Sequence, residues 1–311
     1  MKKLIILLLS VVYFSNTSIA QEEAVFMHYT FNPVLINPAA TGFDPEHYEL
    51  FINLRSSWAS FPDAPKTYAL SYNGPIGNRL GLGAMVYSEN VASLVRYRAQ
   101  LSYAFRFQIK DVDMSFGLST EWHRIQLSNS ISTSDFYEDY IGDMAIEDAM
   151  NGVSDFDASV GLYGSFKRKL YFGIAAPGLI GSKLDSNSGG DLFKYYIFNV
   201  GGEIELNDSK IKLMPSIVLK NVRNVDFQTD INLLATFLNE QLITGLTYRA
   251  GTGGDIGITV GTKYSSLRFV YTYDVYMGDF QKYNGGSHEI TINFEFNRAA
   301  GNYDRAAKYR Q

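Results

Sequence analysis

The chain has 311 residues, a formal net charge of −5 at pH 7 and no cysteine. The lack of cysteine excludes disulfides, thiolate metal sites, cysteine nucleophiles and a lipid-modified cysteine behind a signal peptide. The acidic balance argues against nucleic acid as a partner. No Pro-rich or Ser-rich linker divides the sequence, so we predict one main domain.

Residues 1–20 have the order of a secretory signal peptide. Lys2 and Lys3 precede the apolar run Leu4–Val12 and a small-residue end at Ser18–Ala20. The apolar run is too short for a membrane helix, so we expect export with cleavage after Ala20. Loss of the two lysines leaves 25 of the 27 basic residues against 32 acidic ones.

The next segment, residues 21–48, shows no strand alternation. It carries the stretch FNPVLINPAATGF, in which two Asn-Pro pairs and Gly42 are turn-forming. A pure linker would have no use for its many apolar residues. We therefore predict an ordered, non-repetitive segment that packs in or on the following domain.

From residue 49 onward the pattern is that of long strands. In Leu94–Phe107 apolar and polar residues alternate with period two, which sends them to opposite faces of a strand. The stretch exceeds the roughly nine to eleven residues that cross a bilayer at a tilt. The 22 tyrosines and 21 phenylalanines suit aromatic girdles at two bilayer interfaces. The pattern therefore favours a transmembrane barrel.

Similar alternation and turn residues predict about fourteen strands within residues 49–297, an even number typical of a single-chain antiparallel β-barrel. The predicted strands are 49–59, 65–75, 79–89, 93–107, 112–125, 154–166, 169–177, 194–206, 210–220, 224–238, 241–250, 255–264, 266–275 and 287–297. Short turns join them at one end, and long connections such as Leu127–Val153 lie at the other. With both termini in the periplasm, the long loops face the exterior. A soluble two-sheet sandwich is the structural alternative, but its strands should be shorter.

The stretch MHYTFNPVLINPAATGF, followed by Arg55–Trp58 in a strand, Ala64–Thr67 and Leu80–Gly83, resembles the PorP/SprF family of Bacteroidota outer-membrane proteins. The likeness runs through the whole chain after the signal peptide, and Ala40–Gly42 is a minor departure. The family motif residues are Phe31, Asn32, Pro33, Asn37, Pro38, Ala39 and Gly42. We hypothesise that Phe31, the two Asn residues and the two Pro residues fix the segment against the barrel wall.

Several charged positions are candidates for a role in such a barrel. Strand alternation predicts a lumen-facing set comprising Arg96, Arg98, Arg106, Glu203, Glu205, Arg268, Asp274, Glu289 and Glu295. The longest loop carries Asp135, Glu138, Asp139, Asp143, Glu147 and Asp148, which we interpret as a solvated surface rather than a cation-bridged or basic-partner contact. Residues 298–311 form a basic tail, interpreted as a periplasmic end or contact.

Enzyme and cofactor signals are weak. The four histidines show no metal-ligand spacing. The stretch Asp185–Asp191 resembles the start of a calcium loop, but Tyr196 stands where a bidentate Glu is needed. No Gly-x-Ser-x-Gly elbow is present, although His123 or His288 beside a serine leaves a barrel esterase as an alternative. We predict no enzyme, no metal and no cofactor.

The resemblance implies a non-enzymatic accessory of the type IX secretion system in the outer membrane, active in secretion and gliding. Its implied partners are outer-membrane lipid, a secreted cargo with a C-terminal sorting domain or an adhesin, and a periplasmic peptidoglycan-binding lipoprotein. The sequence does not distinguish among these protein partners. A transporter of small or hydrophobic solutes, with a similar strand number and an N-terminal plug, is the alternative function.

Overall fold

The computed structural model describes residues 26–61, 63–128, 150–184, 191–206, 210–222, 227–251, 254–277 and 285–298. Its strands are β1 (His47–Ser56), β2 (Lys66–Ile76), β3 (Leu80–Val91), β4 (Leu94–Ile109), β5 (Val112–Leu127), β6 (Val153–Phe166), β7 (Leu170–Ala176), β8 (Tyr196–Gly202), β9 (Ile204–Leu206), β10 (Ile211–Asn221), β11 (Gln228–Phe237), β12 (Leu242–Ala250), β13 (Asp255–Tyr264), β14 (Leu267–Tyr276) and β15 (Ser287–Asn297). The 3-10 helices η1 (His28–Thr30), η2 (Pro33–Leu35) and η3 (Pro38–Ala40) precede β1, and the helix α4 (Leu179–Leu184) follows β7.

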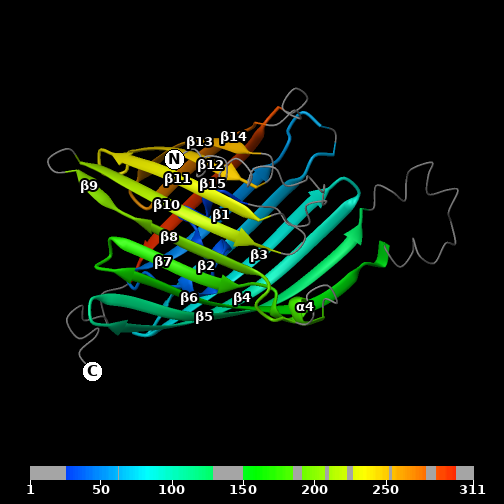
Figure 1. Cartoon of the computed structure of the whole chain (residues 1–311), viewed down its shortest axis with the longest axis horizontal. Coiled ribbons are helices and arrows are strands. Elements are labelled where there is room, and N and C mark those ends of the chain that lie inside the picture. The colour runs from blue at the N-terminus through cyan, green and yellow to red at the C-terminus, as the bar shows by residue number, and fades with distance from the viewer. Residues whose placement is uncertain are drawn as a thin grey trace, which may run out of the picture.

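The strands form one antiparallel sheet that closes on itself (Figure 1). β1 pairs with β15 along its whole length, and β10 pairs with β11. β8 and β9 keep one register on β10 and form a single strand interrupted at Glu203. The predicted fourteen-stranded barrel is therefore confirmed.

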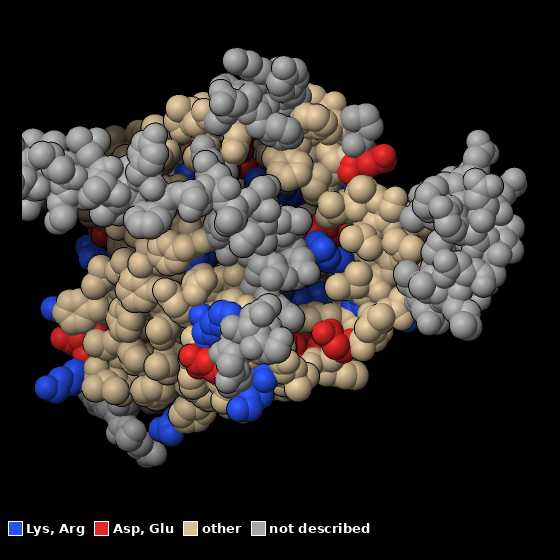
Figure 2. All heavy atoms as spheres, turned by 45° about the vertical axis from the view of Figure 1, so that its right-hand side comes forward, with Lys and Arg blue, Asp and Glu red and all other residues tan. Residues whose placement is uncertain are grey.

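The two faces of the wall differ as the period-two pattern requires. On β2, Tyr68, Leu70 and Tyr72 point outward and are exposed, whereas Ser71 and Asn73 point inward and are buried. An isolated soluble protein would not expose so large an apolar surface, whereas a bilayer covers it. In the view towards the loops, uncharged residues make up most of the wall, and charged residues gather at the mouth and the rims (Figure 2).

We call the end of the barrel that holds the start of β1 and the end of β15 the turn end, and the opposite end the loop end. At the turn end, β4 joins β5 through Lys110 and Asp111, and β13 joins β14 through Ser265 and Ser266. The loop end has longer connections, between β5 and β6 and between β7 and β8. The shortest connection there consists of Ala92, with φ of 50°, and Ser93, which join β3 to β4.

Some predicted boundaries differ from the structure. β1 begins at His47, two residues before the predicted start at 49, and the predicted strand through Trp58 ends at Ser56. The cause of the early end is the backbone of Trp58, whose φ of 51° is incompatible with a strand. The predicted strand 194–206 is interrupted at Glu203. Among the described residues no helix is long and apolar enough to cross a membrane.

Candidate functional site

The lumen of the barrel is occupied by the segment Phe26–Glu46, which we call the plug. Each of the two Asn-Pro pairs starts a short 3-10 helix, because proline fixes φ and needs no backbone donor at a first helical position. Asn37 also caps η3, since its Oδ1 accepts the backbone N–H of Ala39 at 2.9 Å. The plug is therefore ordered by its own sequence as well as by the wall around it.

A first group of charges, which we call clamp A, holds the start of the plug. The Glu289 carboxylate accepts the backbone N–H groups of Met27 at 2.8 Å and His28 at 2.9 Å. The Arg55 guanidinium bridges Glu289 at 2.8 Å and Asp274 at 2.7 Å. These side chains are almost fully buried, so removal of one charge would leave its partners uncompensated. Clamp A comprises Arg55, Asp274 and Glu289.

A second group, clamp B, comprises Lys220, Asp230 and Arg249 and holds Tyr29. The tyrosine hydroxyl donates to the Asp230 carboxylate at 2.8 Å, and the Lys220 ammonium lies 4.9 Å from the centre of the tyrosine ring. Asp230 in turn pairs with Lys220 at 2.8 Å and with Arg249 at 2.9 Å. The two clamps together hold equal numbers of positive and negative side chains, which permits their burial.

Amide side chains fasten the rest of the plug to the wall. Asn32 Nδ2 donates to Asn53 Oδ1 at 3.2 Å and to Ser71 Oγ at 3.1 Å. Asn37 Nδ2 donates to the backbone oxygen of Leu162 at 2.9 Å. Both asparagines are fully buried, so these bonds replace the water that they lose. Each Asn of the family motif therefore reaches a different side of the barrel.

Glycines of the wall allow the plug to lie directly against the strands. A Cβ atom on Gly117 would lie 2.3 Å from the backbone of Ala39, and one on Gly161 would lie 2.1 Å from the side-chain oxygen of Asn37. No side chain fits at either position without displacing the plug. The inward glycines are therefore part of the plug-binding surface.

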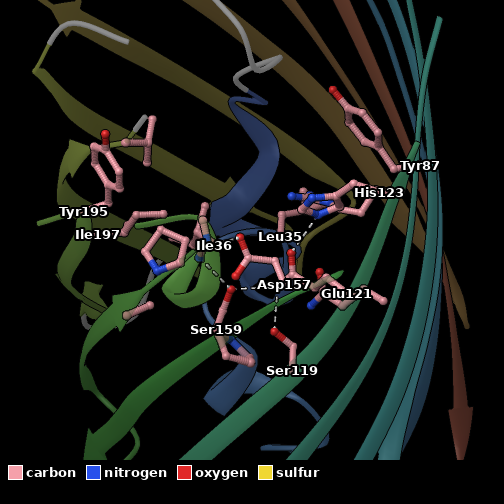
Figure 3. A pocket seen from close by; sticks show the side chains of 18 of the residues that line it. Leu35, Ile36, Tyr87, Ser119, Glu121, His123, Asp157, Ser159, Tyr195 and Ile197 are labelled. Carbon is pink, nitrogen blue, oxygen red and sulfur yellow. Dashed lines mark hydrogen bonds and ion pairs between the residues drawn. The ribbon is translucent and has the colours of Figure 1, made fainter. Parts of the chain in front are cut away.

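Above the plug, a cavity of about 280 Å³ opens towards the loop end (Figure 3). Val34, Leu35 and Ile36 of the plug form an apolar floor, and charged side chains line the wall. Those charged residues are Glu89, Arg96, Arg98, Glu121, His123, Arg124, Asp155, Asp157 and Lys220. The plug thus turns a continuous lumen into a pocket that is closed at its base.

One cluster in this pocket resembles catalytic machinery in composition but not in geometry. Ser119 and Ser159 each donate to Glu121 Oε1 at 2.7 Å, while His123 Nε2 lies 3.3 Å from Glu121 Oε2. A serine nucleophile requires its hydroxyl on the imidazole, whereas here both hydroxyls lie on the carboxylate. His288 lies outside the lumen, where its Nδ1 is 2.7 Å from the Tyr271 hydroxyl. Neither histidine forms the arrangement of an esterase.

Most of the residues singled out from the sequence lie in four places, which are the plug, clamp A, the pocket and the turn end. Asn32, Asn37, Pro38 and Ala39 of the motif are buried in the plug. Asp274 and Glu289 belong to clamp A, whereas Arg96 and Arg98 line the pocket. The remaining members of the lumen-facing set lie near the turn end, and they are Arg106, Glu203, Glu205, Arg268 and Glu295.

Other motif residues and some expected sites have different placements. Phe31 and Pro33 are half-buried. Gly42 is buried, and its N–H donates to Asn73 Oδ1 at 2.9 Å. The acidic loop set and the tail from 299 onward lie outside the described residues, as does most of the calcium-like stretch. In the parts of the chain that the structure describes, no group of three or more acidic or histidine side chains is placed to hold a metal ion.

The sequence pattern did not identify four residues of the clamps as partners of the plug. They are Arg55, Lys220, Asp230 and Arg249. Each is a charged residue on the inward face of a predicted strand. A systematic search for charged residues at inward positions would have found them. The partner that each one contacts across the barrel has no local signal.

An apolar outer wall, a polar lumen and a fastened plug define a transmembrane β-barrel of the outer-membrane type. A family model described as "Type IX secretion system membrane protein PorP/SprF" matches residues 18–294. The chain therefore belongs to the PorP/SprF family and is an outer-membrane protein of the type IX secretion system. No curated protein matches the sequence.

Solved structures show similarity at the level of fold. A deletion mutant of the TodX monoaromatic hydrocarbon channel superposes with a TM-score of 0.50 at 9% identity, over 87% of this chain and 94% of that one. The Ralstonia pickettii toluene transporter TbuX gives 0.49 at 10% identity, over 86% and 93%. The Acinetobacter baumannii outer membrane protein Omp33 gives 0.48 at 5% identity, over 81% and 98%.

Proposed function

We propose that this protein is a non-enzymatic accessory barrel that holds a secreted protein at the cell surface for the type IX secretion system. The observation that carries the proposal is the plug, which two buried clamps fasten and which closes the base of the pocket above it. A barrel closed in this way acts through its surfaces and its pocket rather than by conduction. Membership of the PorP/SprF family supports the same role.

In this proposal the loop end faces the exterior and the turn end faces the periplasm. The longer connections and the pocket then meet secreted protein, while the charged turn end, where Lys212 pairs with Glu203 at 2.9 Å, meets periplasmic components. The implied partners are a secreted protein with a C-terminal sorting domain or an adhesin on one side and a peptidoglycan-binding lipoprotein on the other. Lipid of the outer membrane surrounds the apolar wall.

The test is binding of a purified C-terminal sorting domain, taken from a protein secreted by the same cells, to the detergent-solubilised barrel. We expect a saturable complex that survives gel filtration. The comparison is the same domain with an unrelated plugged barrel of similar size. If the native barrel forms no complex with the sorting domain, the retention role is refuted.

The alternative function is passage of small or hydrophobic solutes. The apolar floor of the pocket favours this alternative, and the TodX channel shares the fold at the level given above. Conductance in planar bilayers and solute uptake distinguish the two functions, because the plug must leave or rearrange for a solute to pass. Steady single-channel currents, or uptake of a defined hydrocarbon, would support transport instead of retention.

A further inference from the structure

The barrel wall has a step between β6 and β7. β7 pairs only with Val160–Phe166 of β6, whereas β5 pairs with β6 from Val153 onward. Within the described chain no strand pairs with the other side of Val153–Ser159, which we call the β6 edge. β6 therefore extends past its neighbour at the loop end (Figure 1).

The backbone groups along the β6 edge alternate in direction. Lys167 donates to the Asp111 oxygen at 3.0 Å, which places the odd-numbered residues in hydrogen-bonded pairs with β5. The even-numbered residues then direct N–H and C=O to the opposite side. Ala158 agrees with this parity, since its N–H donates to the Asp157 side chain at 2.7 Å. Phe156 therefore presents its backbone groups along the edge.

The sequence diverts the chain that would otherwise cover this edge. Pro177 follows β7 and has no backbone donor, and Gly178 takes φ of 64°, so the chain turns into the lumen. The Asp157 carboxylate then accepts the N–H groups of Ile180 at 2.8 Å and Gly181 at 3.1 Å, which holds α4 on the lumen side. The open edge is thus a consequence of residues that fix α4 elsewhere.

An extended polypeptide is the chemistry that satisfies such an edge, because its N–H and C=O groups have the same spacing. The side chains define the two faces of the added strand. Phe156 points outward, is 72% exposed and lies opposite Trp122, which suits apolar residues facing lipid. Asp155 points inward with a side chain that is 67% exposed, which suits basic or polar residues on the other face.

We propose that the β6 edge binds an extended segment of the retained secreted protein by strand addition. This proposal rests on the proposed function and names the surface at which retention occurs. The added strand continues the wall from β6 and alternates apolar and basic or polar residues in the register of Phe156 and Asp155. Other occupants of the edge, such as a second copy of the barrel, are outcomes of the test below.

The test compares two substitutions at one residue. Phe156→Pro removes the edge donor at a position where proline is tolerated, whereas Phe156→Ala removes only the ring. Both full-length barrels are purified after heat-modifiable migration shows that they are folded, and each is titrated with the purified sorting domain. We expect Phe156→Pro to lose binding and Phe156→Ala to keep most of it.

A second measurement uses the absence of cysteine in the chain. Single Ser154→Cys and Thr120→Cys variants are tested for disulfide cross-links to a cysteine series along the sorting domain. Ser154 lies on the open edge, whereas Thr120 lies on β5, which is paired on both sides. We expect cross-links with a period of two residues from Ser154→Cys and none from Thr120→Cys.

The results distinguish strand addition at the β6 edge from the retention function on which it rests. If the native chain binds the sorting domain and both Phe156 variants bind it equally, strand addition is refuted while retention stands. Equal loss in both variants would also refute it, because a ring contact would then explain binding. Cross-links between two barrels in place of the sorting domain would assign the edge to a dimer. Failure of the native chain to bind would refute retention itself.

Discussion

The substitution Glu289→Gln tests whether clamp A fastens the plug. The native carboxylate accepts two plug N–H groups and the Arg55 guanidinium, and it is fully buried. The glutamine amide keeps one oxygen acceptor, but its NH2 group replaces the second oxygen. That NH2 group is itself a donor and cannot accept from the plug N–H groups or from Arg55. A hydrogen bond to a charged group contributes about 1.5–3 kcal/mol, and breaking a buried pair costs about 3–5 kcal/mol. A loss of about 3 kcal/mol raises the released population of the plug about a hundredfold.

The assay is the labelling rate of Met27→Cys by a membrane-impermeant maleimide, because Met27 is 3% exposed and the native chain has no cysteine. The matched control is Glu295→Gln, which removes an inward carboxylate of the same strand that pairs with Lys263 at 2.7 Å and Arg268 at 3.1 Å near the turn end. We expect fast labelling only with Glu289→Gln. Equal rates in the two variants would refute the assignment of clamp A.

Three further outcomes follow from the same contacts. Gly117→Ala should displace the plug and speed labelling, whereas Gly202→Ala, whose added Cβ would meet nothing closer than 3.4 Å, should not. Asn37→Ala should lower the free energy that holds the plug against the wall by about 1–3 kcal/mol, which is measured as faster amide exchange in the plug. Unchanged exchange, barrel folding and sorting-domain binding would reject the role of this motif residue. Burial raises the pKa of the Glu240 carboxyl, but Arg268 and Lys263 lower it by more. Glu240→Gln should therefore destabilise the barrel at neutral pH and lose this effect as pH falls through the lowered pKa; a pH-independent difference would contradict the sign.

The barrel could be predicted because its pattern is local. Alternation in β4 or β15 is readable within one strand, and it determines which residues meet lipid. The break at Trp58 was harder to predict, since its left-handed backbone occurs at a residue that is neither glycine nor proline. The interruption at Glu203 directly follows Gly201 and Gly202, which are a local signal for it.

The plug could be predicted in part. The Asn-Pro pairs predicted an ordered segment. The residues that hold this segment are far away in sequence, since Met27 and its acceptor Glu289 are 262 positions apart. Pairing over that distance depends on closure of the whole barrel. The inward position of Glu289 was therefore predictable, whereas its role as acceptor for plug N–H groups was not.

The strand β15, near the end of the chain, contacts two segments near its start, which are β1 and the plug. It closes the wall against β1, and its Glu289 and Thr291 side chains receive the segment that was made first, with Thr291 Oγ1 2.7 Å from His28 Nδ1. A polypeptide that stopped before β15 would have neither a sealed seam nor a seated plug. Sealing of the cylinder and blocking of the passage through it therefore depend on the same strand, so neither can be achieved without the other.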